Sequence, residues 1–131
     1  MNNDEQNVDK DVDITRPYTL RPLMDKDLYT VLSIIDKIFP GEKLQEAFDQ
    51  IATEGKTPEE IGIQVATKLG FALIRNIVTA HDEIYALLAD VSGLKVEAID
   101  DLPFGTGPMM IFDIVNNAKN ADFFKVVFKL A

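Results

Sequence analysis

The residues of this sequence best suited to acid-base chemistry are its single histidine and the carboxylates beside it. His81 is followed by Asp82 and Glu83, a grouping that would suit a general base held next to acids. Adjacent residues of a helix point about 100° apart, so these three side chains cannot converge on one substrate. We therefore expect His81 to lie at the surface, in the first turn of a helix, and not to be catalytic.

Two other carboxylate pairs and one glycine-rich turn raise the same question. Asp100-Asp101 and Glu59-Glu60 are expected to be helix-terminal charges that face water. Gly105-Thr106-Gly107 lacks the lysine and the preceding strand of a phosphate-binding loop, so we expect a turn there. The chain has no cysteine and no calcium-loop spacing. The sequence therefore predicts no enzyme activity, no metal site and no cofactor.

Composition restricts the partners and the compartment. A chain of 131 residues suits one domain with its own core. The net charge of −9 repels a phosphate backbone, which argues against nucleic acid, and attracts basic protein surfaces. The start of the chain is acidic and lacks the basic, then apolar pattern of a secretory signal, and no run approaches 18 apolar residues. We expect a cytosolic protein without a membrane span.

The beginning of the chain differs from the rest in composition. Residues 1–16 are polar and acidic and show no hydrophobic period, which predicts a disordered tail ahead of a single helical domain over residues 17–131. Tyr18 to Arg21 stand between Pro17 and Pro22, and each proline biases the residue before it away from helix. A short extended segment laid on helices is expected there.

Apolar residues then recur at helical spacing, which predicts an all-α fold, a compact bundle of about five to six helices. Thr57 and Glu60 should form a capping box around Pro58, with a weaker box at Thr79 and Asp82, and Asn120 should cap the last helix. The expected helices cover about 25–39, 42–52, 58–78, 80–91 and 108–116, with a short turn over 96–102 and a last helix from 121.

Two of these helices are unusually apolar. The helix from Pro58 has Gln64, Lys68 and Arg75 as its only consistent polar stripe, so we expect it to be central and surrounded by others. The last helix carries apolar side chains over an arc of roughly 200°, about twice the usual width. Either it is buried in its own core, or part of it binds another chain. The candidate partner-binding residues are Phe123, Phe124, Val127, Phe128 and Leu130.

Three stretches, taken in order, carry a family likeness. They are YTLRPLMDKDLYTVLSIIDKI over residues 18–38, DEIYALLADVSGLKVEAIDDLP over 82–103, and DFFKVVFKL over 122–130. Together they resemble the tail assembly chaperones of long-tailed, siphovirus-type phages and prophages of Gram-positive bacteria. One departure is the insertion of residues 104–108 after the Leu-Pro turn, where such chaperones pass directly into a charged helix.

The resemblance implies a non-enzymatic protein of the host bacterial cytoplasm. It would coat the amphipathic helices of the tape measure protein while the tail assembles, and it would self-associate. The residues by themselves leave a second class open, a small acidic helical adaptor or regulatory protein that binds one folded partner. The number of copies bound to each partner would distinguish the two.

Overall fold

The computed structural model describes residues 16–131, and every regular element in that range is a helix. The all-α prediction is confirmed. The predicted disordered tail covers residues 1–16, of which 1–15 lie outside the described residues and Arg16 is held by an ion pair with Asp113. None of the helices in residues 16–131 combines the length and the apolar character needed to cross a bilayer. The helices are α2 (Asp25–Ile38), α3 (Lys43–Asp49), α4 (Pro58–Arg75), α5 (His81–Ser92), α6 (Val96–Asp100), α7 (Thr106–Val115), the 3-10 turn η1 (Ala118–Asn120) and α8 (Ala121–Leu130).

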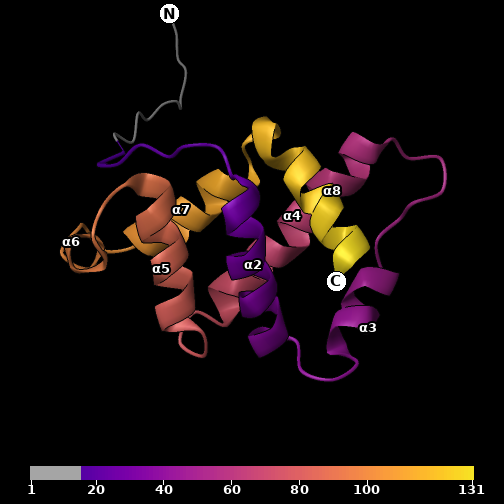
Figure 1. Ribbon diagram of the computed structural model, residues 1–131, viewed down its shortest axis with the longest axis horizontal. Coiled ribbons are helices and arrows are strands. Elements are labelled where there is room, and N and C mark those ends of the chain that lie inside the picture. The colour runs from indigo at the N-terminus through magenta and orange to yellow at the C-terminus, as the bar shows by residue number, and fades with distance from the viewer. Residues whose placement is uncertain (1–15) are drawn as a thin grey trace, which may run out of the picture.

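The helix α4 crosses the middle of the bundle and packs against both α8 and α7, while α2 packs against α5 (Figure 1). In the same view α8 lies across α4, and the short helices α3 and α6 lie at opposite ends of the molecule. The centre is filled by aliphatic side chains, because each of the long helices turns its apolar face inward. The largest fully buried ones are Ile34, Leu69, Ile84, Leu88, Met110 and Ile111.

Small residues on α4 allow its neighbours to approach closely. Gly62, Ala66 and Gly70 are spaced four residues apart and are all buried, so they form one stripe along the helix. A Cβ atom placed on Gly62 would overlap the backbone carbonyl of Ala121 in α8, and one placed on Gly70 would lie 2.9 Å from a methyl group of Val115 in α7. The tight packing of α4 therefore depends on these glycines.

The helix boundaries test the predicted caps. The capping box is confirmed: the Thr57 hydroxyl accepts from the Glu60 amide at 3.1 Å, and the Glu60 carboxylate accepts from the Thr57 amide at 2.8 Å. The second predicted box is wrong, because the N-cap of α5 is Ala80, which makes no side-chain bond. Likewise α4 ends at Arg75 and not at Val78, since the Asn76 amide side chain donates to the Ala72 carbonyl at 2.8 Å.

The turn before α7 also differs from the prediction at its boundary. The helix begins at Thr106, two residues before the predicted start at Pro108. Gly105 adopts φ 87°, a left-handed conformation that glycine tolerates, and the Thr106 amide then donates to the Pro103 carbonyl at 3.1 Å. Pro108 is compatible with this start because the amides of a first helical turn have no partner within the helix.

Residues 16–24 form a strap that crosses the helices without regular structure, as predicted for its Tyr18 to Arg21 portion. The Arg21 amide donates to the Val91 carbonyl at 3.0 Å, and the Leu23 amide donates to the Asn120 side chain at 3.0 Å. Asn120 thus occupies the N-cap position of α8 but makes no capping bond, since its buried side chain holds the strap and the Ile114 carbonyl instead. The predicted capping role of Asn120 is wrong.

Charged groups fix both ends of the strap. Arg16 forms a bidentate ion pair with Asp113 of α7, at 3.0 and 3.1 Å, and the Tyr18 hydroxyl donates to the same carboxylate. Burial alone would raise the pKa of Asp113, but the hydrogen bonds from Arg16 and Tyr18 outweigh it, and the pKa is lowered. At the other end Arg21 bridges the buried Asp27 of α2, at 2.7 Å, and Asp90 of α5, at 2.8 Å.

Candidate partner-binding surface

The residues singled out for chemistry do not assemble into a site. His81 lies exposed in the first turn of α5, as predicted, where its ring stacks on Tyr85 with centroids 4.3 Å apart. Its Nδ1 is 3.3 Å from an oxygen of the exposed Asp82, whereas Glu83 turns away to bind Lys37 at 2.7 Å. The three side chains therefore diverge.

The other chemical candidates have structural roles. Asp100, Asp101 and Glu59 are exposed, and Glu60 belongs to the capping box, where its hydrogen bonds with Thr57 lower its pKa. Of the turn predicted at Gly105-Thr106-Gly107 only Gly105 lies outside α7, and Gly107, in the first turn of that helix, lies against the Tyr85 hydroxyl. Among residues 16–131 no group of three or more histidine, aspartate or glutamate side chains is placed to hold a metal ion.

The structure divides the five predicted partner-binding residues of α8. Phe124 and Val127 are only 3% and 0% exposed, so neither is available to a partner in this chain, and their predicted role does not fit the structure. Phe123 and Phe128 are partly buried, and the Phe128 ring packs on Phe48 of α3 with centroids 5.1 Å apart. Leu130 alone among the five is largely accessible, at 59%.

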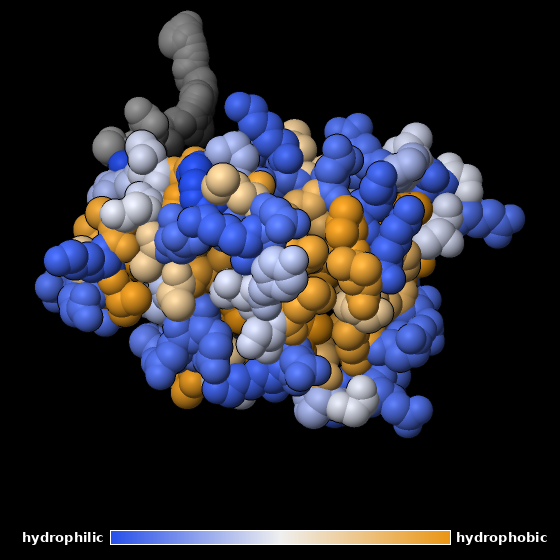
Figure 2. Space-filling view, in the orientation of Figure 1, coloured by the Kyte–Doolittle hydropathy of each residue, from blue (hydrophilic) through white to orange (hydrophobic). Residues whose placement is uncertain are grey.

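The arc of α8 is wide because several neighbours cover it. The helix packs on α4 along one side and contacts α2, and Phe48 reaches it from α3. What remains outward is a narrow apolar stripe, of which Val126 and Leu130 are the exposed members. In Figure 2 hydrophobic side chains are visible over α8 and toward α3, within a largely hydrophilic face.

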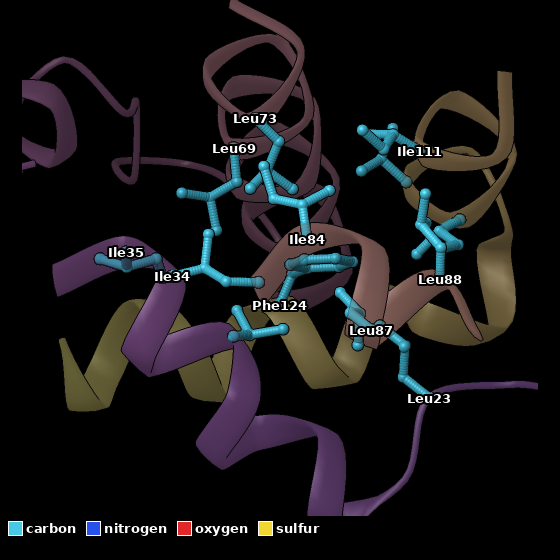
Figure 3. A pocket seen from close by; sticks show the side chains of 13 residues that line it. Leu23, Ile34, Ile35, Leu69, Leu73, Ile84, Leu87, Leu88, Ile111 and Phe124 are labelled. Carbon is cyan, nitrogen blue, oxygen red and sulfur yellow. The ribbon is translucent and has the colours of Figure 1, made fainter. Parts of the chain in front are cut away.

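A cavity at the centre of the bundle is a packing defect. Its volume is about 20 Å³, and aliphatic side chains of several helices surround Phe124 there (Figure 3). That volume approximates the space of one water molecule, and the lining offers no polar partner for a water. We therefore do not assign it a ligand.

A much larger hollow lies between α3 and α4. This α3/α4 groove is open to solvent and has a volume of about 800 Å³. Ile38, Phe39, Ala47, Ile51 and Ala72 give it apolar surface, and Ile63 and Phe71 of α4 are 48% and 58% exposed beside it. Large hydrophobic side chains exposed together around a groove are typical of a protein-binding site.

Hydrogen bonds at one end keep the groove in shape. The Gln64 side chain pairs with both backbone groups of Ala52, donating to the carbonyl at 2.8 Å and accepting from the amide at 3.1 Å. The Lys68 ammonium donates to the Gln50 side chain at 3.0 Å. Gln50 and Ala52, at the end of α3 and just after it, are thus tied to Gln64 and Lys68 of α4.

The apolar surface of α4 continues to α7. Phe71 also borders a smaller hollow of about 40 Å³, on whose far side lies Phe112 of α7, itself 53% exposed. Gly70 and Val115 lie in the same hollow, where α4 and α7 approach closely. Ile63, Phe71 and Phe112 therefore mark an exposed apolar surface across two helices, beside the groove that α3 borders.

The sequence contains a signal for this surface. Ile63, Thr67 and Phe71 recur every four residues, so they share one face, and that face lies about 100° around the helix from the buried stripe of Gly62, Ala66 and Gly70. An apolar circumference on α4 predicted a helix surrounded by others. That prediction is wrong for Ile63 and Phe71, because α7 and α8 pack on the glycine side and leave this adjacent face exposed.

Comparisons with known proteins add no assignment: no family model, curated protein or solved structure matches this chain.

Proposed function

We propose that this chain is a non-enzymatic assembly chaperone that binds amphipathic helices of an extended partner. The observation that carries the proposal is the open α3/α4 groove, with Ile63 and Phe71 exposed beside it. An amphipathic helix lays its apolar face into such a groove and anchors through side chains spaced three and four residues apart. The binding surface proposed here includes the accessible Leu130 of α8 as a neighbouring contact, and excludes the buried Phe124 and Val127.

The size of the groove and its apolar side chains support a helix as the occupant. A helix with its side chains is about 10 Å wide, so a volume of about 800 Å³ accommodates one face of two to three turns. Complete burial of an Ile or Phe side chain is worth roughly 1.5–3 kcal/mol, and these two are already about half covered. Covering Ile63 and Phe71 would therefore contribute about 1 kcal/mol each, and the other apolar residues that line the groove would supply the rest of the binding free energy.

The wall formed by α3 supports adaptation to different clients. The helix has seven residues, and Phe48 is the one buried side chain within it. Gly41 and Gly55 flank it, and both adopt positive φ angles that permit sharp turns of the chain. A short element held by few buried side chains moves at lower free-energy cost than a core helix. Reversible binding of many similar helices requires that kind of adjustment.

The partner that fits these properties is the tape measure protein of a long-tailed phage. The apolar faces of its long amphipathic helices would have to be shielded from water in the host bacterial cytoplasm until tail-tube subunits enclose them. The net charge of −9 favours solubility of a complex that carries several copies of this chain. Self-association along the client is part of the same proposal.

The test compares two exposed phenylalanines. We would coexpress the chain with helical segments of a tape measure protein and measure the soluble complex by size exclusion with light scattering. Phe71→Ser should lower recovery of the complex about fivefold, while Phe104→Ser, at an exposed loop position away from the groove, should leave it unchanged. Equal recovery with both variants would contradict the proposal.

The same measurement distinguishes coating from a one-to-one adaptor. Several copies per client segment, increasing with segment length, are expected for a chaperone that covers an extended helix. A constant single copy, whatever the length of the segment, would instead favour the adaptor or regulatory class.

A further inference from the structure

The α3/α4 groove carries a charge opposite to that of the whole chain. Lys43, Lys68 and Arg75 line it, and Glu46 is the one carboxylate among its lining residues. The chain as a whole has a net charge of −9. At physiological ionic strength the field of a charge decays within about 8 Å, so a bound segment responds mainly to the charges that line the groove.

The positive charges of the groove are not neutralised by the described part of the protein. Within residues 16–131 Lys43 and Arg75 form no salt bridge, and Lys68 donates to the neutral side chain of Gln50. By contrast, the cations around the strap and α2 are used internally: Arg21 pairs with Asp27 and Asp90, and Lys37 with Glu83. The cations of the groove are therefore available to a ligand.

The charged and apolar groups of the groove alternate along α4. Lys68 and Arg75 are seven residues apart, which places them on the same side of the helix two turns from each other. Phe71 lies between them in sequence and is exposed. A helix that buries its apolar face against Phe71 and Ile63 would thus bring its polar edge near Lys68 and Arg75. Carboxylates on that edge would be attracted to the two cations, and ammonium groups would be repelled by them.

We infer that the groove selects amphipathic helices with glutamate or aspartate along the edge of their apolar face. This inference rests on the proposed function and specifies the client more narrowly. It is the reverse of what net charge predicts, since an acidic protein should prefer basic clients. Partly exposed ion pairs change binding by about threefold each, so the three cations, less the opposing effect of Glu46, should favour an acidic-edged helix over a basic-edged one by about tenfold.

Two synthetic helical peptides provide the test. Both have 18 residues and the same leucine face, and they differ only in the flanking positions, which are all glutamate in one and all lysine in the other. Binding of each fluorescein-labelled peptide to the full chain is measured by anisotropy, at low salt and at about 1 M salt, where charges more than about 3 Å apart are screened. We expect the glutamate peptide to bind about tenfold more tightly, and the ratio to fall toward one at high salt.

Charge reversal should invert the preference. Lys68→Glu combined with Arg75→Glu should make the lysine peptide the tighter ligand. The matched control is Lys95→Glu combined with Lys119→Glu, two exposed lysines outside the groove lining, which changes net charge by the same amount. The control should keep the wild-type order of the two peptides. Helicity measured by circular dichroism verifies that all variants are folded.

The outcomes separate this inference from the proposed function. Both peptides could bind, with Kd values that Phe71→Ser raises, but without a preference or with a preference for the lysine peptide. In that case the groove binds helices and the charge selection is wrong. If neither peptide binds, both proposals fail. If the free chain sediments as a dimer that Phe71→Ser dissociates, a second copy occupies the groove and the inference is overturned.

Discussion

The last helix and the outer face of α4 look alike in sequence but have opposite environments in the fold. Both are apolar over more of their circumference than a surface helix requires. In α8 the width is explained by coverage, since Phe124 and Val127 enter the core and Phe128 packs on Phe48. In α4 the width is not covered, and Ile63 and Phe71 remain in contact with solvent.

The difference shows that the apolar width of a helix does not determine how much of it is buried. Burial depends on how many neighbours pack around the helix, and the small residues of α4 decide where those neighbours lie. Gly62 and Gly70 draw α8 and α7 to the same side of α4, because close backbone packing is possible only where side chains are absent. The adjacent face of α4 is then left to the short helix α3 and to solvent.

The largest effect should follow from a charge in the buried face of α8. Phe124→Asp removes an aromatic ring from the core and places a carboxylate among aliphatic side chains, at a cost of at least about 4 kcal/mol. Stabilities of small domains are about 5–15 kcal/mol, so the variant should lose most of its stability. Circular dichroism during urea titration measures this loss.

A folded Phe124→Asp variant of nearly wild-type stability would show that α8 detaches from α4 in solution. The five predicted partner-binding residues of α8 would then be available after all, and the distinction between the two helices would fail. Leu130→Ser is the matched control on the same helix, and it should change stability by no more than about 0.5 kcal/mol.

The second effect concerns the close contact between α4 and α8. Gly62→Ala improves helix propensity by about 1 kcal/mol in an exposed helix, but here the new methyl group overlaps the Ala121 carbonyl. Since backbone atoms cannot rotate away, α8 must shift, and we expect a net loss of about 3 kcal/mol in the free energy of unfolding. Thr67→Ala on the open face of α4 lacks such a neighbour and should be close to neutral. A neutral or stabilising Gly62→Ala would contradict the packing argument.

Local features of the fold were predictable from the sequence, whereas the arrangement of the helices was not. Hydrophobic period and the Thr57 capping box indicated the helices, because both signals lie within a few residues of one another. The predicted box at Thr79 is wrong, because Ala80 is the N-cap of α5. The predicted capping role of Asn120 is wrong because its side chain hydrogen-bonds the backbone groups of Leu23 and Ile114 instead. Which face of α4 stays open depends on contacts between helices far apart in sequence, and a single helical pattern does not contain them.

The third effect is a pH-dependent loss of stability at the strap, where Arg21 binds the start of α2. Asp27 is buried and accepts hydrogen bonds from Arg21 at 2.7 Å and from the Met24 amide at 2.7 Å. Burial alone would raise the pKa of Asp27, but the bonds from Arg21 and Met24 outweigh it, and the pKa is lowered. Asp27→Asn should cost about 2 kcal/mol at pH 7, because hydrogen bonds to a charged group are lost.

The sign of the pH dependence follows from the lowered pKa. A carboxylate whose folded pKa lies below its unfolded value of about 3.9 stabilises the fold above that pH, and its contribution is lost as the pH falls through the folded pKa. The stability difference between wild type and Asp27→Asn should therefore be constant near neutral pH and shrink below about pH 4. Urea titrations at several pH values measure it, and a difference that grows on acidification would contradict the assignment.

The smallest effect on stability should come from the residue proposed to matter most for binding. Phe71 is 58% exposed beside the α3/α4 groove, so Phe71→Ser removes little buried surface, and serine and phenylalanine have similar helix propensities. We expect a change within about 0.5 kcal/mol, measured by urea titration, together with weaker binding of a dye that fluoresces on apolar surfaces. A loss of about 2 kcal/mol or more would mean that Phe71 is part of the core in solution. The outer face of α4 would then be as covered as α8, and the two helices would no longer differ in the way that supports a binding surface.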